Sequence, residues 1–251
     1  ETSAHILESL IKYEAVHEIR GWTDLRRRLA PDRRSFGFFH PALPDEPIIF
    51  VEVALTAGLA TSIQDVIDAP TLALEAEPAN DADTAIFYSI TNCQTGLRGI
   101  SFGSFLIKQV TERLAVEQPT LTTFSTLSPI PGFAAWLAEN RPSIDTTDDV
   151  QMVQSCATYL LTVRRRGLPQ DPVARFHLRN GASVEQINWR GDTSAKGMAE
   201  SHGLLVNYLY SGQDIAANNE ALTLDGVVTA SKQVAGLIDP ADESLVRVPA
   251  N

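Results

Sequence analysis

A glycine-bearing loop that leads into a helix is the first stretch of the sequence with a chemical capacity. Gly99 and Gly103 lie in the segment 96–108, and an apolar pattern at helical spacing follows over 104–117. Unpaired backbone N–H groups at such a helix start, together with the positive end of the helix dipole, can hold a phosphate or pyrophosphate. The spacing is neither GxxxxGKS/T nor GxGxxG, so it indicates neither ATP hydrolysis nor dinucleotide binding. A tight turn that binds nothing is the alternative.

A serine hydroxyl at the end of a strand is the second candidate. Ser128 follows a β-rich run over 121–127 and precedes Pro129 and Pro131. Prolines cannot continue a strand ladder, and they force the residues before them into extended conformations. The hydroxyl of Ser128 is therefore predicted to be held rigidly. A helix follows from Phe133, so a helix-capping serine is the alternative interpretation.

The elements that must position these groups alternate between strands and helices. The sequence pattern predicts strands over 48–55, 84–90, 121–127 and 183–189. Helical spacing covers 2–29, 104–117 and 150–163, and a further helix begins at Phe133. Three prolines between His40 and Ile48 predict a break in the chain. This order predicts an α/β or α+β fold with a mixed central sheet flanked by helices.

The composition excludes several classes of protein. The 251 residues carry 20 Lys and Arg against 31 Asp and Glu, a net charge of −11, which argues against a nucleic-acid surface. No apolar stretch approaches the length of a membrane span, and no secretory leader opens the sequence, so a cytoplasmic location is predicted. Cys93 and Cys156 lack metal-ligand spacing and are interpreted as buried small hydrophobes.

Two basic runs stand out against this acidic background. Arg26–Arg28 with Arg33 and Arg34 form one, and Arg164–Arg166 form the other. They can be a solvated helix face with cations favoured by a helix C-terminus. The alternative is an anion-collecting rim, which suits a small polyanionic ligand better than a long one.

Four stretches together resemble the catalytic region of malonyl-CoA decarboxylases. They are 40–56, 99–108, 124–133 and 171–182. Within them, LSPIPGF (127–133) and FHLRNGA (176–182) are distinctive. The similarity extends from about Ala15 to Lys232, with a shorter interval between the serine and the histidine than is usual in the family.

The resemblance implies a fold like that of the Gcn5-related N-acetyltransferases (GNAT), in which a loop-to-helix turn holds the CoA pyrophosphate. It implies that residues 1–30 are a remnant or linker of an N-terminal helical domain, and that 31–251 form the GNAT-like catalytic domain. Family members self-associate through the helical domain, so a homo-oligomer is expected. The peroxisomal tail of the family is missing after Asn251.

The resemblance also implies a reaction and a set of site residues. Malonyl-CoA would lose CO₂ and become acetyl-CoA, with the thioester as electron sink and no metal or organic cofactor. His177, whose pKa suits proton exchange near pH 7, would donate a proton to carbon 2. Ser128 would bind the substrate and act as proton acceptor. The predicted substrate-binding residues are Arg98, Gly99, Ile100, Ser101, Phe102, Gly103, Ser104, Ser128, His177 and Tyr210.

Less specific interpretations remain open at this stage. His177 can be a core histidine, and Asn180 can orient it or merely form a turn with Gly181. His40 is interpreted as a surface residue. The same CoA site could serve acyl transfer to an amine or thiol, or a module that binds acyl-CoA without catalysis. No nucleic-acid or membrane partner is expected.

Overall fold

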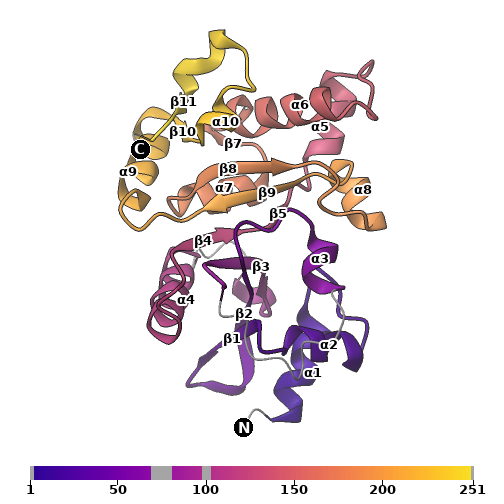
Figure 1. Ribbon diagram of the computed structural model, residues 1–251, viewed down its shortest axis with the longest axis vertical. Helices are drawn as coiled ribbons and strands as arrows, with labels where there is room; N and C mark the ends of the chain where they lie inside the picture. Colours follow the sequence, from indigo (N-terminus) through magenta and orange to yellow (C-terminus); the bar gives the residue numbers. More distant parts are fainter. Residues whose placement is uncertain (1–2, 69–80, 98–102, 250–251) are drawn as a thin grey trace. The chain divides into compact units, whose positions relative to one another are not determined.

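A computed structural model describes residues 3–68, 81–97 and 103–249 of the chain (Figure 1). The chain forms two compact units, Glu1–Phe124 and Ser125–Asn251. Strand β4 (Thr123–Thr126) contains the boundary between them. The predicted division near residue 30 remains a prediction.

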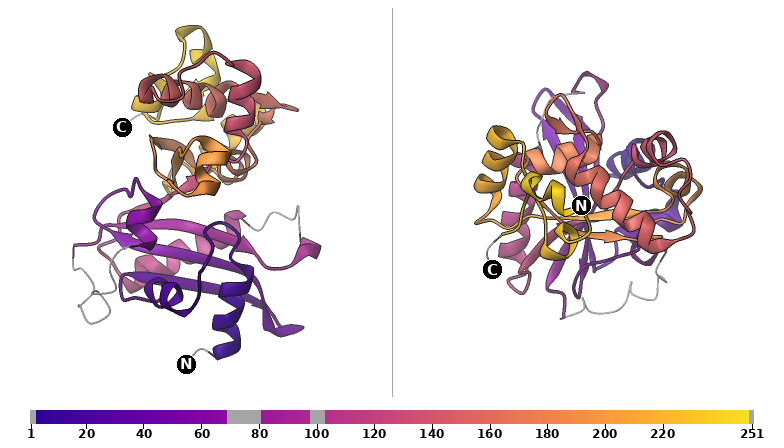
Figure 2. Two further views of the ribbon diagram at one scale, coloured as in Figure 1. Left: turned by 90° about the vertical axis from the view of Figure 1, so that its right-hand side faces the viewer. Right: turned by 90° about the horizontal axis from the view of Figure 1, so that it is seen from above.

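An antiparallel sheet organises the first unit, in which β2 pairs with β1 and with β3 (Figure 2). The elements of this unit are α1 (Ala4–Tyr13), α2 (Trp22–Arg28), β1 (Arg33–His40), β2 (Leu43–Thr56), α3 (Ile63–Ile67), β3 (Thr84–Asn92), the 3-10 turn η2 (Thr95–Leu97) and α4 (Gly103–Glu117). A cluster of buried residues under α1 and α2 includes Leu10, Leu25 and Phe50. The predicted helices at 2–29 and 104–117 therefore correspond to α1 and α2, and to α4.

Strand β2 is longer than the sequence pattern predicts. Its buried part agrees with the predicted strand at 48–55, and the Val53 side chain has no exposed surface. A turn at Pro41 and Ala42 breaks the chain after His40 as predicted, but the strand begins at Leu43 and runs through Pro44 and Pro47, so the break does not extend to Ile48. The register of β1 against β2 shifts on both sides of Phe39. A proline that lacks its N–H is tolerated at such an irregular part of a ladder.

Three of the five arginines in the first basic run fit neither interpretation of that run. Arg27, Arg28 and Arg33 are buried and form neither a solvated face nor an anion-binding rim. Arg28 Nη1 lies 2.9 Å from Glu52 Oε2, and both side chains are only 1% exposed. Arg28 Nη2 also donates to the carbonyl oxygen of His17 at 2.8 Å. Arg28 therefore anchors the N-terminal segment to strand β2, whereas Arg26 is exposed.

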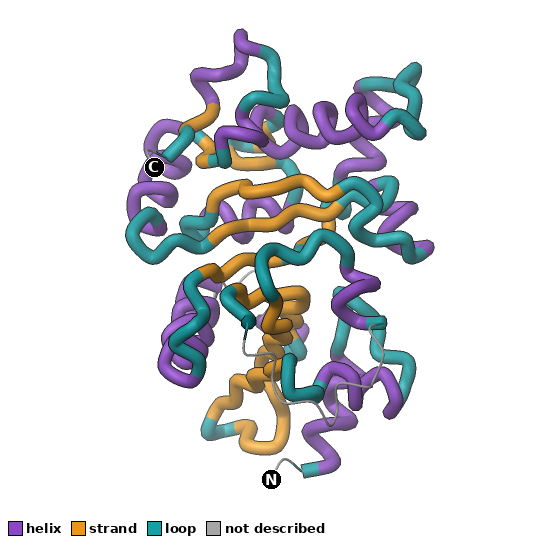
Figure 3. The backbone as a smooth tube through the Cα atoms, viewed as in Figure 1, coloured by secondary structure: helices purple, strands orange, loops and turns teal. Residues whose placement is uncertain are grey.

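Two adjacent antiparallel strands, β8 and β9, lie at the centre of the second unit (Figure 3). Strand β9 also pairs with β4 and β5, and Val184 of β8 forms a parallel bridge with Ala230. The elements of this unit are β5 (Ser128–Pro129), α5 (Phe133–Asn140), α6 (Asp149–Thr162), β6 (Arg164–Arg165), β7 (Leu168–Pro169), α7 (Pro172–Arg179), β8 (Ser183–Asn188), α8 (Ala195–Ser201), β9 (Leu205–Leu209), α9 (Ile215–Glu220), the π-helical turn η3 (Ala221–Asp225), β10 (Val228–Thr229), α10 (Lys232–Ala235), the 3-10 turn η4 (Pro240–Leu245) and β11 (Val246–Arg247). This arrangement confirms the α/β class with a mixed sheet flanked by helices.

The second basic run divides between two roles. Arg164 Nη2 donates to the carbonyl oxygen of Leu161 in the last turn of α6, as expected for a cation at a helix C-terminus. Arg165 and Arg166 are exposed in the β6–β7 hairpin. Arg166 and Gly167 both have positive φ, at 55° and 80°, as a tight hairpin turn requires.

Candidate active site

The short strand β5 positions Ser128 inside the second unit. Ser128 pairs with Val206 of β9, and Pro129 pairs with Leu205. The Ser128 side chain is buried, and the residue is 5% exposed. The extended conformation that the two prolines predict for this segment is therefore present.

Helix α7 carries His177 on its buried face. The helix begins after Asp171, whose Oδ1 accepts the backbone N–H groups of Val173 and Ala174, and Pro172 occupies its first turn. Ala174, His177 and Leu178 are its buried residues, at the i, i+3, i+4 spacing of one helix face. The residue His177 is 4% exposed.

Two tyrosines from β9 and its end enclose the imidazole. Tyr208 and Tyr210 are two residues apart, so they project from one face of the strand. The His177 ring stacks on Tyr208, with ring centroids 4.7 Å apart, and meets the edge of Tyr210 at 6.1 Å. A strand from one part of the unit and a helix from another thus form one aromatic enclosure.

Hydrogen bonds join these side chains into a continuous chain. Tyr210 Oη lies 2.8 Å from His177 Nδ1, and His177 Nε2 lies 3.2 Å from Ser128 Oγ. Ser128 Oγ donates to Thr126 Oγ1 at 2.8 Å. The structure therefore brings together three of the predicted residues, Ser128, His177 and Tyr210, and adds Thr126 to them.

Burial changes the ionisation of this cluster. It lowers the pKa of His177 to about 3, because the charged imidazolium is poorly solvated inside the protein. The expectation of an imidazole that titrates near pH 7 is therefore wrong for the ligand-free protein, in which this imidazole is neutral. Burial also raises the pKa of Tyr208 and of Tyr210 well above the ordinary value, so both phenols stay protonated.

Asp171 links the segment that bears Ser128 to the helix that bears His177. Its Oδ1 caps α7, while its Oδ2 accepts the backbone N–H of Gly132 at 3.1 Å. Gly132 lies four residues after Ser128. Burial raises the pKa of Asp171, and the three backbone N–H groups oppose that rise. One carboxylate thus fixes the relative position of both candidate catalytic side chains.

Two polar atoms beside the site have no hydrogen-bond partner within the described part of the chain. They are the Tyr208 hydroxyl and Asn180 Nδ2. Asn180 ends α7, where its backbone N–H bonds the His177 carbonyl at 3.0 Å, and Gly181 follows with φ of 83°. The turn interpretation of Asn180 is therefore correct.

The other predicted substrate-binding residues are those of the loop 98–104. Of the predicted CoA-binding loop, Arg98, Gly99, Ile100, Ser101 and Phe102 lie outside the described residues. Gly103 and Ser104 are the first two residues of α4, which agrees with the predicted helix start.

Other titratable side chains are accounted for by structure. His40 is exposed, and its Nδ1 accepts the backbone N–H of Ala42. Cys93 and Cys156 are buried free thiols, and burial raises the pKa of Cys93 to about 12. Over residues 3–68, 81–97 and 103–249, no cluster of three or more His, Cys, Asp or Glu could hold a metal ion. No helix within those same ranges has the length and apolar character needed to cross a membrane.

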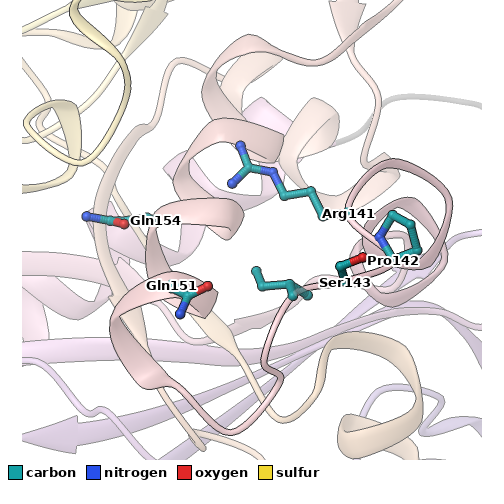
Figure 4. A pocket seen from close by; sticks show the side chains of 6 residues that line it. Arg141, Pro142, Ser143, Gln151 and Gln154 are labelled. Carbon is teal, nitrogen blue, oxygen red and sulfur yellow. The ribbon is translucent and has the colours of Figure 1, made fainter.

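A pocket of about 310 Å³ lies at a different place, between the end of α5 and α6 (Figure 4). Its lining residues are Arg141, Pro142, Ser143, Ile144, Gln151 and Gln154. Arg141 is already engaged, since it donates to Ser155 Oγ at 3.2 Å and lies over the Trp136 ring. None of the predicted site residues lines this pocket.

Thr126, Tyr208 and Asp171 belong to the site but are not among the residues predicted from the sequence. Thr126 and Ser128 are two apart in an extended segment, as are Tyr208 and Tyr210, so alternation along a strand could have paired each with its neighbour. Asp171 followed by Pro172 is a recognisable helix start. These local signals were present, but only the tertiary fold shows that they converge.

Comparison with solved structures places the fold in a known class. The GNAT-like decarboxylase GphF, solved in complex with isobutyryl-CoA, is 18% identical, with a TM-score of 0.54 over 84% of this chain and 96% of that one. This similarity shows that the fold is GNAT-like, as expected.

Sequence comparison is more specific. Residues 1–153 and 143–248 match the malonyl-CoA decarboxylase C-terminal domain. The chain belongs to the malonyl-CoA decarboxylase family.

Individual relatives agree with this assignment. The goose (Anser anser anser) mitochondrial malonyl-CoA decarboxylase is 36% identical over 95% of this chain and 56% of its own length. The crystal structure of malonyl-CoA decarboxylase from Agrobacterium vitis is 50% identical, with a TM-score of 0.85, and the match covers 94% of this chain and 64% of that one. The corresponding structure from Rhodopseudomonas palustris is 48% identical, with a TM-score of 0.81, over 93% and 63% of the two chains. The chain thus spans less than two thirds of these relatives.

Proposed function

We propose that this chain decarboxylates malonyl-CoA to acetyl-CoA and CO₂. The supporting observation is the buried pair of Ser128 Oγ and His177 Nε2, 3.2 Å apart, in a member of this family. The pair is enclosed by tyrosines and held by Asp171. It supplies a hydroxyl and a proton-bearing ring at one point.

The reaction is balanced without a cofactor. The bond between the carboxylate carbon and carbon 2 breaks, CO₂ leaves, and the electron pair delocalises onto carbon 2 and the thioester oxygen. Carbon 2 then takes a proton from His177, and a proton from water replaces it. Hydrogen bonding to the developing oxyanion is commonly the largest catalytic contribution, about 3 to 4 kcal/mol for one donor.

The lowered pKa of His177 makes its acidity depend on the substrate. A neutral imidazole is a poor acid, whereas a carboxylate or enolate beside Nε2 favours the protonated ring and raises the pKa. His177 therefore becomes an effective proton donor once the malonyl group is bound. Ser128 binds the carboxylate or thioester oxygen and accepts a hydrogen bond from the protonated His177 Nε2, and Tyr210 holds Nδ1 in place.

The proposal also covers the binding of CoA, the absence of a cofactor, the oligomeric state and the cellular location. The loop Arg98–Ser104 holds the CoA pyrophosphate, and no metal or organic cofactor takes part. The chain forms a homo-oligomer through an N-terminal helical domain, to which residues 1–30 belong as a helical remnant or linker. Its location is cytoplasmic, although the name of the goose relative places that protein in mitochondria.

An assay with malonyl-CoA as sole substrate tests the reaction. Acetyl-CoA and CO₂ are measured for wild type, His177→Asn and Ser128→Ala. Loss of the general acid is expected to lower kcat by about 10² to 10⁴-fold, and loss of the serine hydroxyl by about 10² to 10³-fold.

Matched controls separate chemistry from folding. His202→Asn changes a partly exposed histidine at the left-handed end of α8, where asparagine is tolerated, and Ser143→Ala changes an exposed serine. Both are expected to retain wild-type turnover. Turnover that needs an added amine or thiol indicates acyl transfer instead, and binding of malonyl-CoA without CO₂ release indicates a module that lacks catalysis.

A further inference from the structure

We propose that Thr126 is a positioning residue that fixes the tautomer of His177, so that Nε2 carries the ring proton and faces Ser128. The tautomer assignment stands on the hydrogen bonds alone. Its catalytic consequence rests on the proposed function.

The oxygen of Thr126 accepts two hydrogen bonds. Thr126 ends β4 and is 1% exposed. Its Oγ1 accepts the Ser128 hydroxyl proton at 2.8 Å and the backbone N–H of Tyr208 at 3.2 Å. Both donors lie within the same buried cluster, so this oxygen acts as a fixed acceptor.

Counting protons then settles the state of the imidazole. A serine hydroxyl has one proton, and that of Ser128 is directed to Thr126. Ser128 Oγ therefore presents a lone pair to His177 Nε2, which lies 3.2 Å away and must supply the proton of that contact. A neutral imidazole carries only one N–H, so Nδ1 is an acceptor. The Tyr210 hydroxyl, 2.8 Å from Nδ1, donates to it.

Neighbouring amides keep Thr126 in place. Asn207 Nδ2 donates to the Thr126 carbonyl oxygen at 2.8 Å, and Asn188 Nδ2 donates to Asn207 Oδ1 at 2.7 Å. Asn207 is fully buried, and Asn188 is 5% exposed. A buried, satisfied network of this kind restricts each group to one orientation.

Removal of the Thr126 hydroxyl should move the ring proton of His177 from Nε2 to Nδ1. In Thr126→Val, the nearest remaining acceptor for the Ser128 proton is His177 Nε2, so the ring proton moves to Nδ1. The Ser128 hydroxyl proton then occupies Nε2, the nitrogen that must carry the proton donated to carbon 2 once the malonyl group is bound. A wrong tautomer of a catalytic histidine is costly, and kcat for malonyl-CoA is expected to fall by about 10²-fold or more with little change in KM.

Nitrogen-15 NMR of histidine-labelled protein reads the tautomer directly. The chain has five histidines, and the spectrum of His177→Asn identifies the signals of His177. In wild type, Nε2 should be the protonated, pyrrole-type nitrogen and Nδ1 the pyridine-type one. Thr126→Val should exchange the two, and Thr126→Ser should restore the wild-type pattern and turnover. Tyr210→Phe, which removes the Nδ1 partner but leaves Thr126 intact, should keep the proton on Nε2.

The outcomes are distinguishable. A wild-type spectrum in which His177 carries its proton on Nδ1 overturns the assignment, and this result needs no variant at Thr126. Retention of the proton on Nε2 in folded Thr126→Val also overturns it. A protein that shows the predicted exchange but releases no CO₂ contradicts the proposed function and leaves the positioning role supported.

Discussion

At the scale of single residues, the site is a cluster of polar groups inside a largely apolar enclosure. Each polar atom along the path from Thr126 to Tyr210 has a partner, which is what burial requires. The cost of that burial falls on the charged form of His177. His177 is therefore neutral in the ligand-free site, and the proposed mechanism requires that a bound anion raise its pKa.

This ionisation has a consequence for stability. The pKa of His177 falls from 6.5 to about 3 on folding, so the unfolded chain binds a proton at this residue between those pH values and the folded chain does not. The contribution to stability is complete above pH 6.5 and is lost as the pH falls toward 3. Between pH 7 and pH 4.5, the free energy of unfolding should decrease by about 2 to 3 kcal/mol from this residue.

Denaturant unfolding at the two pH values, in wild type and in His177→Asn, measures this contribution. The variant should lose less stability on acidification than wild type does. The matched control His202→Asn should follow wild type. Parallel curves for wild type and His177→Asn would mean that folding does not change the pKa of His177.

At the scale of secondary-structure elements, Asp171 connects helix α7 to the turn after β5. A single carboxylate accepts N–H groups from Val173, Ala174 and Gly132. Since α7 has only eight residues, its own backbone hydrogen bonds cannot define its direction strongly. The distance between Ser128 and His177 therefore depends on this cap.

Asp171→Ala should reduce both stability and activity. It removes the cap and leaves buried N–H groups without a partner, which should lower the free energy of unfolding by about 2 to 3 kcal/mol. Turnover of malonyl-CoA should fall as well, because the two candidate catalytic side chains lose their common anchor. Thermal unfolding and the CO₂ assay measure the two effects.

A second helix provides the control for this prediction. Asp148 caps α6 through the N–H of Gln151 at 3.0 Å, and this cap lies in an exposed region. Asp148→Ala should cost about 1 kcal/mol of stability without loss of turnover per folded molecule. An equal loss of turnover in both variants would show that Asp171 acts through global stability alone.

At the scale of the whole molecule, the two units carry buried groups with opposite responses to pH. In the first unit, burial raises the pKa of Glu52 from 4.5 to about 8, with Arg28 opposing the rise and Glu14 adding to it. The folded chain then holds a proton at Glu52 that the unfolded chain releases. The stabilisation from this residue is present below pH 4.5 and is lost as the pH rises toward 8.

Glu52→Gln should therefore flatten the alkaline side of the stability profile. Glutamine keeps a neutral acceptor for Arg28 and removes the titration. The difference in free energy of unfolding between Glu52→Gln and wild type should shift in favour of the variant as the pH rises from 5 to 8. Chemical denaturation across this range gives the slope, and a difference that stays constant with pH would contradict the raised pKa.

Features that depend on neighbouring residues could be predicted from the sequence, whereas features that depend on contacts between residues far apart in the sequence could not. The extended segment at Ser128 could be predicted because its prolines act on their immediate neighbours. The burial of Arg28 could not, because its partner Glu52 lies 24 residues away on β2. The same holds for His177, because burial lowers its pKa and the tyrosines that contact its ring follow it by more than 30 residues. Its location in the site was predicted only through the family resemblance.

The direction of the Ser128 hydroxyl has one more consequence. In serine hydrolases, the serine gives its proton to the histidine and becomes a nucleophile that attacks an ester or thioester. Here the proton points to Thr126, so the same two side chains meet without activating the serine oxygen. In the proposed reaction, acetyl-CoA would therefore keep its thioester bond, because His177 Nε2 would carry the ring proton and could not act as the base that an acyl-enzyme needs.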